Sequence, residues 1–312
     1  MAKDKGRLKL GIGDDAALVE VGRGNQVILT TDLSIEGVHF LRGLHTPRAV
    51  GHRALARALS DIAAMGGTPR FALISLAISS RTTRSWLEDL YGGFLGLAKQ
   101  LRVALVGGDT AVVSGGVSVD IVAVGEVPRG RALRRSGARA GDQLFVSGTL
   151  GRSALGFSLL RAGRARKAAS VKAALRAHLY PEPRCALGRY LSERRLASAC
   201  IDVSDGLSTD LAHLGDSSGV GARIWASRIP VPETSLPRGG NSPLQLALHG
   251  GEDYELLFAV PPDKLSRIPR AFRGVALHRI GEISRSRKLT LIRSDGKIIP
   301  LVSAGHDHFR KH

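Results

Sequence analysis

Acidic side chains gather in six short segments of this 312-residue chain, and most of these segments are rich in glycine or in apolar residues. The segments are "GIGDDAA", "TTD", "LSDIAAMGG", "VGGDT", "IDVSDG" and "GGEDYE". A carboxylate that leaves water needs a cation or hydrogen-bond donors around it. Any fold that buries these segments must therefore bring cations or hydrogen-bond donors to them. The acids are Asp14, Asp15, Asp32, Asp61, Asp109, Asp202, Asp205, Glu252, Asp253 and Glu255.

Strands and helices alternate in the first part of the chain, which is typical of an α/β protein. A helix is expected to begin after Thr46, its N-cap, with Pro47 in the first turn, and to end at the glycine pair 66–67. A second helix is expected over residues 82–101, although a glycine pair inside it is unfavourable. The expected strands span residues 26–32, 71–79 (buried), 102–109 and 117–127 (half-exposed).

A stretch rich in proline, glycine and arginine over residues 128–141 divides the chain into two expected domains. They span residues 1–128 and 129–312, and a chain of this length can bury a core in each. Beyond the boundary, residues 142–148 predict a strand and residues 151–163 a helix, and the C-terminal half continues to alternate. We therefore expect two α/β domains.

The charge of the chain is strongly positive, with 45 lysines and arginines against 27 acids and a formal net charge of +18. Such a charge attracts nucleic acids, but aromatic residues make up only 4% of the chain and no nucleic-acid-binding motif is present. We therefore expect a basic surface without a specific nucleic-acid site. The two cysteines lack metal-site spacing, and no apolar segment is long enough to span a membrane or form a signal peptide. These features favour a cytoplasmic protein.

Asp61 and Asp109 each have a structural and a functional interpretation. Asp61 borders the apolar face of the helix expected over residues 47–65, so it is either a half-buried carboxylate with a partner or a solvated acid. Asp109 follows a strand expected to be buried and two glycines, which let a ligand approach the backbone, although a simple turn also explains the pattern. The recurrence of such segments along the chain weakens the structural interpretation.

The segment "IDVSDGLSTDL" gives a sharper signal. Asp202 and Ser204 alternate with apolar neighbours, so both side chains are expected to leave the strand on one face. Asp205 is explained by an N-cap of the following helix, but Asp202 is not. Ligands bind at the carboxyl ends of strands in α/β sheets, and helix N-termini suit phosphate. The three side chains therefore predict a metal or phosphate site.

The chemistry of these acids points to magnesium and nucleotide. The segment "GIGDDAA" matches a dinucleotide-binding fingerprint in form, but two aspartates would repel a pyrophosphate there, so we reject that interpretation. Carboxylates with few histidines among them are hard oxygen ligands, which suit Mg²⁺. Neither the P-loop nor the protein-kinase motif set is present. The residues thus indicate an enzyme that holds ATP through metal ions and belongs to neither common class.

The motifs taken in order resemble the thiamine-monophosphate kinase family. They are "GIGDDAA", "TTDLSIEGVHF", "ALSDIAAMG", "LVGGDT", "GRALRRSGARAGD", "IDVSDGLSTDL", "GGEDYEL" and the terminal "HDHF", and they extend over residues 10–309. The wider superfamily includes aminoimidazole-ribonucleotide synthetase and selenophosphate synthetase. The resemblance implies a two-domain α/β fold of the aminoimidazole-ribonucleotide-synthetase type, in which the N-terminal ATP/Mg-binding domains pair across a homodimer and the C-terminal domain completes the site.

The resemblance also assigns roles to individual residues. The implied Mg²⁺ ligands are Asp15, Asp32, Asp61, Asp109, Asp202 and Asp205, with Thr30 and Thr31 assisting. The implied nucleotide contacts are Gly108, Asp109, Arg135 and Ser204, and the implied catalytic residues are Asp205, Asp109 and Arg135. The implied contacts to the substrate are His39, Glu252, Ser303 and His306.

The implied reaction is the ATP-dependent phosphorylation of thiamine monophosphate to thiamine diphosphate by direct in-line transfer with Mg²⁺. Another ATP-dependent enzyme of the superfamily, or a basic binding protein that has lost catalysis, is the alternative. Two departures from the family stand out: the first motif begins as early as residue 11, and Ser303 and His306 stand where aromatic residues are common. The second departure predicts a weaker platform for the thiamine rings.

Overall fold

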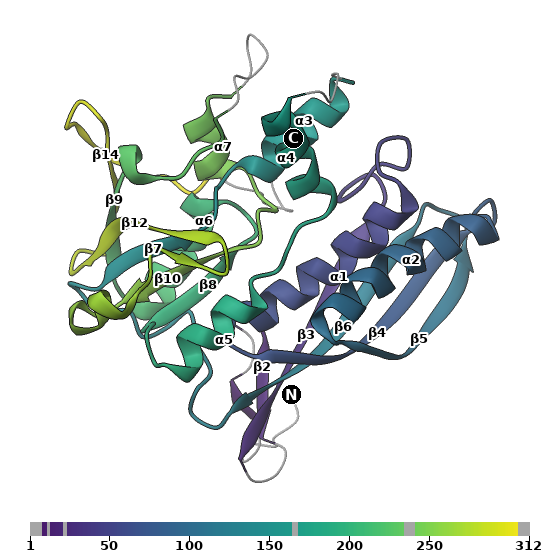
Figure 1. The fold of residues 1–312 in the computed structure, drawn as a ribbon, viewed down its shortest axis with the longest axis horizontal. Coiled ribbons are helices and arrows are strands. Elements are labelled where there is room, and N and C mark those ends of the chain that lie inside the picture. The colour runs from purple at the N-terminus through teal and green to yellow at the C-terminus, as the bar shows by residue number, and fades with distance from the viewer. Residues whose placement is uncertain (1–7, 11–12, 21–23, 164–167, 234–240, 305–312) are drawn as a thin grey trace.

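The computed structural model describes residues 8–10, 13–20, 24–163, 168–233 and 241–304. Two β-sheets are built from successive parts of the chain, and helix α1 (Pro47–Ala64) lies between them (Figure 1). The first sheet has the order β1-β2-β3-β6-β4-β5, with one parallel pair, β4 and β5. Its strands are β1 (Leu8–Leu10), β2 (Ala17–Glu20), β3 (Asn25–Ile35), β4 (Thr68–Ser79), β5 (Ala104–Val113) and β6 (Ser118–Pro128).

Helices α1 and α2 (Arg84–Leu101) cover one face of the first sheet (Figure 1). The expected start of α1 is confirmed, because the hydroxyl of Thr46 accepts a hydrogen bond from the amide of Ala49 at 3.2 Å. Close packing against α1 explains the glycines inside α2. A Cβ atom on Gly93 would stand 1.8 Å from the carbonyl oxygen of Arg48 on α1. The two helix backbones therefore touch, and this contact outweighs the low helix propensity of glycine.

The opposite face of the first sheet is open in this chain. Strand β4 was expected to be buried, but only its helix-covered face is, and Phe71 on the open face is 47% exposed. Leu33 on β3 is exposed to the same extent. Strand β5 does not end at Asp109 as expected. It continues to Val113 at the edge of the sheet. The expectation that this strand is buried was also wrong, because burial depends on what lies opposite a strand as well as on its own apolar residues.

The second sheet has the order β14-β13-β9-β12-β7-β10-β8, with β11 paired to β12. Its strands are β7 (Gln143–Ser147), β8 (Ala199–Val203), β9 (Gly221–Trp225), β10 (Glu255–Val260), β11 (Ala271–Phe272), β12 (Val275–Ser284), β13 (Leu289–Ile292) and β14 (Ile298–Pro300). Its helices are α3 (Arg152–Arg161), α4 (Ala169–Leu179), α5 (Cys185–Glu193), α6 (Leu207–Ser218) and α7 (Pro243–His249), with short 3₁₀ turns at Ala226–Arg228 and Pro262–Arg267. The strand and helix expected just after the proposed boundary are confirmed as β7 and α3.

Helix α1 connects the two halves of the molecule. It packs on β3 and β6 of the first sheet and also contacts β8 and α5 of the second half. Strand β8 is buried along its whole length, with α6 also packed against it. The C-terminal end of α1 and the end of β8 therefore meet in the interior, where the acidic segments converge. None of the helices in the described part of the chain is long and apolar enough to cross a membrane.

Candidate active site

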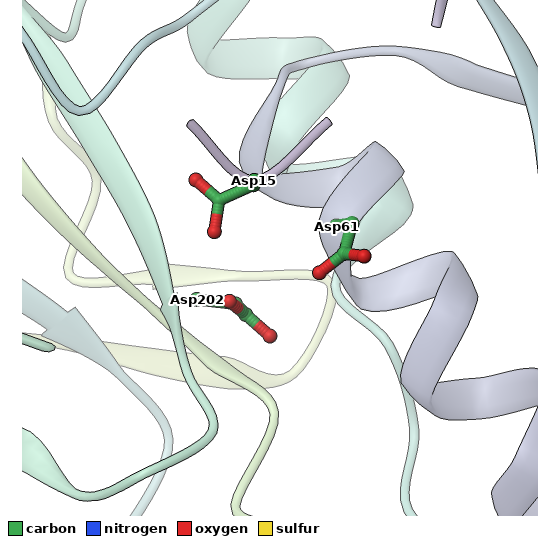
Figure 2. A group of neighbouring side chains, drawn as sticks. All are labelled: Asp15, Asp61 and Asp202. Atoms are coloured by element: carbon green, nitrogen blue, oxygen red, sulfur yellow. The ribbon is translucent and has the colours of Figure 1, made fainter. Parts of the chain in front are cut away.

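Three of the predicted ligands form a compact cluster in the interior. Asp15 precedes β2, Asp61 lies in the last turn of α1 and Asp202 lies on β8. One carboxylate oxygen from each lies within 4.8 Å of the others. Figure 2 shows the three side chains approaching one another from these separate elements. The fold thus brings together carboxylates that are up to 187 positions apart in the sequence.

Each carboxylate of the cluster is held by a donor. The guanidinium group of Arg135 forms a fork on Asp15, with Nε 3.2 Å from Oδ2 and Nη2 3.0 Å from Oδ1. The hydroxyl of Thr30 donates to Oδ2 of Asp61, and the hydroxyl of Ser60 donates to Oδ2 of Asp202 at 2.6 Å. These contacts fix the orientation of the three side chains. Arg135, predicted as a nucleotide contact, is here the counter-ion of Asp15.

Electrostatics makes the cluster a good site for a divalent cation. Burial, and then the neighbouring charge of Asp202, raises the pKa of Asp15 to about 7, although Arg135 opposes this rise. Burial also raises the pKa of Asp61 and of Asp202 above their usual range. Three buried carboxylates repel one another, and oxygen-only ligands of this kind suit Mg²⁺. The donor set therefore fits the predicted metal.

Asp14 does not belong to the cluster. Its carboxylate accepts hydrogen bonds from the amide of Asp15 at 2.9 Å and from the amide of Arg135 at 3.2 Å. Burial raises the pKa of Asp14 to about 6. The side chain thus ties the segment before β2 to the loop that carries Arg135, and Asp15 is the member of the acid pair that faces the other carboxylates.

A pocket of about 310 Å³ lies beside the cluster, between the two halves of the molecule. The apolar side chains of its lining, called the apolar wall below, are Val38, Phe40, Leu41, Ala154 and Phe157. The lining also carries acids and bases, among them Asp61 and Asp202 of the cluster. The lining residues are Asp32, Val38, His39, Phe40, Leu41, Arg57, Asp61, Ala154, Phe157, His178, Asp202, Ser204, Asp205, Gly251, Glu252 and Tyr254.

Glu252, a predicted substrate contact, lies in this pocket in an unusual backbone conformation with φ at +67°. Its amide donates to the carbonyl of Ser204 at 2.7 Å, and its Oε1 accepts a hydrogen bond from Nη2 of Arg53 at 2.6 Å. Burial alone would raise the pKa of Glu252. Arg53, followed by His178, overcomes this effect and lowers the pKa to about 2. The side chain is therefore a fixed negative charge in the pocket.

Asp32 also lies in the pocket, but it has an arginine partner. The guanidinium group of Arg57 forms a fork on its carboxylate, with Nη2 2.7 Å from Oδ1. Sequence reasoning missed both Arg53 and Arg57. A signal was available, because Arg53, Arg57 and Asp61 are four positions apart and share one face of α1.

Asp109 and Thr31 lie away from the cluster within this chain. Asp109 pairs in register with Ser75, which in turn pairs with Asp120, and Thr31 donates a hydrogen bond to Asp120 at 2.8 Å. These side chains are on the open face of the first sheet. Asp32 points to the opposite face, because neighbouring residues of a strand alternate. One chain alone therefore does not bring Asp109 or Thr31 to the three carboxylates.

The turn after β8 caps helix α6 with a residue other than the expected Asp205. Asp205 lines the pocket, but it is not the N-cap of α6, so that prediction was wrong. Gly206 takes the cap position with φ at +107°, a conformation that an aspartate side chain would strain. The free amides of Asp205 and Gly206 instead donate to Asp210, at 3.1 and 3.0 Å. Asp205 is left at the pocket, beside Ser204.

The remaining residues that were predicted to contact nucleotide or substrate lie in different parts of the molecule. The Nδ1 atom of His39 accepts from the amide of Ile35 at 3.0 Å, and the ring lines the pocket. A Cβ atom on Gly108 would stand 2.0 Å from the carbonyl oxygen of Ile74, so strand packing already requires glycine there. Ser303 bonds through its hydroxyl to Thr209 on α6 at 2.9 Å and is not part of the pocket lining. His306 lies outside the described residues.

Two acids of the "GGEDYE" segment have structural partners. The carboxylate of Asp253 accepts from the amides of Gly151 and Ser153, at the start of α3. Glu255 accepts from Nε of Arg184 at 2.7 Å and from the hydroxyl of Ser147. Backbone amides thus satisfy Asp253, and a positive group lies beside Glu255. The apolar wall of the pocket was missed by sequence reasoning, because Phe157 looks like an ordinary core residue of an amphipathic helix.

Comparisons with known proteins agree with this architecture. A model of the N-terminal domain of AIR synthase related proteins matches residues 13–127, and a model of their C-terminal domain matches residues 139–294. The fold is therefore that of AIR synthase related proteins. A crystal structure of the hydrogenase maturation protein HypE, only 19% identical, shares this fold with a TM-score of 0.74 and covers 98% of this chain and 97% of that one.

Curated relatives of higher identity are thiamine-monophosphate kinases. The enzyme of Bacillus subtilis is 36% identical over 308 residues, which cover 96% of this chain and 94% of that protein. The enzyme of Escherichia coli K12 is 37% identical over 310 residues, covering 97% and 92%. A solved structure described as "AaThiL complexed with AMPPCP and TMP" has a TM-score of 0.82 at 34% identity, covering 95% and 92%. With both domain models matched in order and these relatives spanning nearly its whole length, the chain belongs to the thiamine-monophosphate kinase family.

Proposed function

We propose that this protein transfers the γ-phosphoryl group of ATP to thiamine monophosphate and so forms thiamine diphosphate. Membership of the family supports this activity, as does a relative of 34% identity that was solved with AMPPCP and TMP. The observation in this chain that carries the proposal is the position of the three-carboxylate cluster beside a pocket with one apolar and one charged part.

The pocket matches the two parts of the acceptor. Thiamine monophosphate has two rings, one with a permanent positive charge, and a phosphate group at the other end. The apolar wall with Phe157 offers a surface for the rings. Glu252, whose charge is paired with Arg53 through Oε1, lines the same pocket. His39 lies at the same pocket, as the family resemblance implied. The charged part, next to the cluster, is then left for the phosphate.

We propose Asp15, Asp61 and Asp202 as the core of a magnesium site. Mg²⁺ bound there would neutralise negative charge on the phosphate groups of both substrates. The residues of this chain prepare the site: Arg135 orients Asp15, Thr30 orients Asp61 and Ser60 orients Asp202. The further ligand roles of Asp109 and Asp205 stay predictions, as does that of Thr31.

The reaction needs no general base from the protein. The second pKa of a phosphate monoester is about 6, so the acceptor is already mostly ionised at neutral pH. One of its oxygens attacks the γ-phosphorus of ATP, the bond from that phosphorus to the bridging oxygen of ADP breaks, and ADP leaves with the electron pair. The task of the protein is to hold two anions in line, and no residue needs to carry the phosphoryl group.

We also propose that the open face of the first sheet pairs with a second copy of the chain. Leu33 and Phe71, each 47% exposed, provide apolar surface there. Asp109 and Asp120 lie on the same face beside a hollow of about 230 Å³. A partner placed on this face would give Asp109 a new environment, which one chain does not provide. The division into domains 1–128 and 129–312 is part of this proposal, since the first domain carries the face.

We infer a reducing compartment, and hence the cytoplasm, from the cysteines. Cys185 and Cys200 are both buried and free. Burial raises the pKa of the Cys185 thiol to about 12, so it stays protonated. Unpaired thiols are usual in reducing compartments, where disulfides are rare.

A turnover assay tests the proposed activity. Purified protein is incubated with ATP and Mg²⁺ together with thiamine monophosphate, thiamine or an aminoimidazole ribonucleotide precursor, and products are separated by chromatography. We expect thiamine diphosphate from the first acceptor and little product from the others. Asp202→Asn, which removes one carboxylate of the cluster, is the inactive control. Turnover of another acceptor in preference to thiamine monophosphate would refute the proposal.

A further inference from the structure

Arg57 is fixed in position by Asp32. Its Nε atom lies 3.1 and 3.2 Å from the two carboxylate oxygens of Asp32, and its Nη2 atom lies 2.7 Å from Oδ1. Both side chains are largely buried, 14% exposed for the arginine and 20% for the aspartate. A fork of this kind uses one edge of the guanidinium group and fixes the plane of the other. Arg57 is therefore a rigid group rather than a mobile surface arginine.

The other edge of Arg57 is available to a ligand. Its Nη1 atom lies 4.0 Å from Oε1 of Glu252, which is beyond hydrogen-bond distance, and within the described residues it donates to no acceptor. The side chain lines the pocket beside Asp61 and Asp202. A guanidinium group has five N–H donors, so the fork on Asp32 leaves several of them unused. Because Arg57 lines the pocket, these unused donors are available to a ligand bound there.

The carboxylate of Asp32 is already paired with the guanidinium group of Arg57. All hydrogen bonds of this carboxylate in the described chain are to Arg57, and Asp32 is not a member of the compact group formed by Asp15, Asp61 and Asp202. A cation at Asp32 would have to displace a guanidinium group that is held by two atoms and largely shielded from water.

We propose that Arg57 binds the phosphate group of the acceptor substrate, and that Asp32 is the positioning residue of Arg57 and not a magnesium ligand. The inference rests on the proposed function, because it takes thiamine monophosphate as the acceptor. Arginine suits this role, since its planar fork matches two phosphate oxygens and it stays charged at every working pH. A phosphate at Arg57 would lie in the charged part of the pocket, and the apolar wall with Phe157 would remain for the rings.

Binding measurements separate this role from a purely structural ion pair. Calorimetry with Arg57→Gln should show affinity for thiamine monophosphate lowered about ten- to a hundredfold, as expected for a hydrogen-bonded charge pair. Affinity for unphosphorylated thiamine and for a non-hydrolysable ATP analogue should change less than about twofold. Arg57→Lys keeps a positive charge beside Asp32, so it should disturb folding less than Arg57→Gln and should recover part of the lost affinity. Arg48→Gln, at an exposed arginine of the same helix, is the matched control.

A metal count provides a second readout, independent of turnover. Mn²⁺ titration followed by electron paramagnetic resonance should give the same number of bound ions for wild type and for Asp32→Asn, whereas Asp202→Asn should lose one. The loss of an ion from Asp32→Asn would overturn the inference. Equal losses of thiamine and thiamine monophosphate binding in Arg57→Gln would also overturn it, as would a loss of ATP-analogue binding alone. If the wild type binds no thiamine monophosphate, the proposed function fails and the inference fails with it.

Discussion

Replacing Arg53 by methionine should destabilise the protein strongly, because it leaves a buried charge without its partner. Arg53 is only 4% exposed and donates to Glu252 at 2.6 Å across the two halves of the molecule. It also donates hydrogen bonds to the carbonyl oxygens of His178 and His39, and its Nη1 lies 3.3 Å from Nδ1 of His178. Breaking a buried ion pair by removing one partner costs about 3–5 kcal/mol. The pKa of Glu252, lowered from 4.5 to about 2, corresponds to a similar value of about 3 kcal/mol.

The pH dependence of this effect has a definite sign. The pKa of Glu252 is lower in the folded protein than in the unfolded chain. The ion pair therefore contributes its full stability above a pH of about 4.5 and loses it as the pH falls toward about 2. The stability gap between wild type and Arg53→Met should consequently be largest at neutral pH and should narrow in acid.

Urea unfolding at several pH values, followed by circular dichroism, measures this gap. The double variant Arg53→Met/Glu252→Gln should be more stable than Arg53→Met alone at neutral pH, since it also removes the unpaired charge. Arg53→Lys keeps a positive charge and should lose less. If Arg53→Met and the double variant unfold at the same urea concentration, the two side chains are not coupled and the reasoning is refuted.

Further outcomes follow from the cluster, the pocket and the open face. Asp202→Asn should lower turnover by at least about a hundredfold while the protein remains folded, and near-wild-type turnover at saturating Mg²⁺ would contradict its role. Phe157→Ala should raise KM for thiamine monophosphate about five- to a hundredfold with little change in kcat, because ring stacking contributes about 1–3 kcal/mol; an unchanged KM would exclude stacking. Mg²⁺ should raise Tm more at pH 8 than at pH 5. The pKa of Asp15 is raised to about 7, so the metal-free protein loses stability as the pH rises through that value. Once the proton has left, Mg²⁺ can take its place and restore stability. Equal Tm shifts would contradict this. If the open face forms the proposed dimer, the wild type should sediment as a dimer and Leu33→Arg as a monomer, and a variant that sediments like wild type would exclude this face as the interface.

Local signals in the sequence predicted the elements best. The N-cap at Thr46 and the glycine pair after α1 act through the backbone within a few residues, so the bounds of this helix were predictable. The N-cap at Asp205 was wrong for a related reason. Gly206 and Asp210 compete for the same cap, and the choice depends on the strained turn that leaves β8.

Contacts between distant residues were harder to predict. The resemblance to the family suggested that Asp15, Asp61 and Asp202 share a site, but the pattern of residues alone did not. The partner of Glu252 is Arg53, 199 positions away, and an arginine on a helix is more often solvated. The exposure of β5 was missed because apolar residues are the same in a buried strand and at an uncovered edge.

Helix α1 also has consequences for motion. Ser60, Asp61, Arg53 and Arg57 all belong to it, and thirteen of its 18 residues are buried. Local opening is costly for an element with so many internal contacts, so its amide protons should exchange only when the whole molecule unfolds. The distances among these four side chains should then stay constant through the reaction cycle. Any widening of the pocket that admits a substrate must come from the segments around it, such as the stretch of residues 36–45 before the helix.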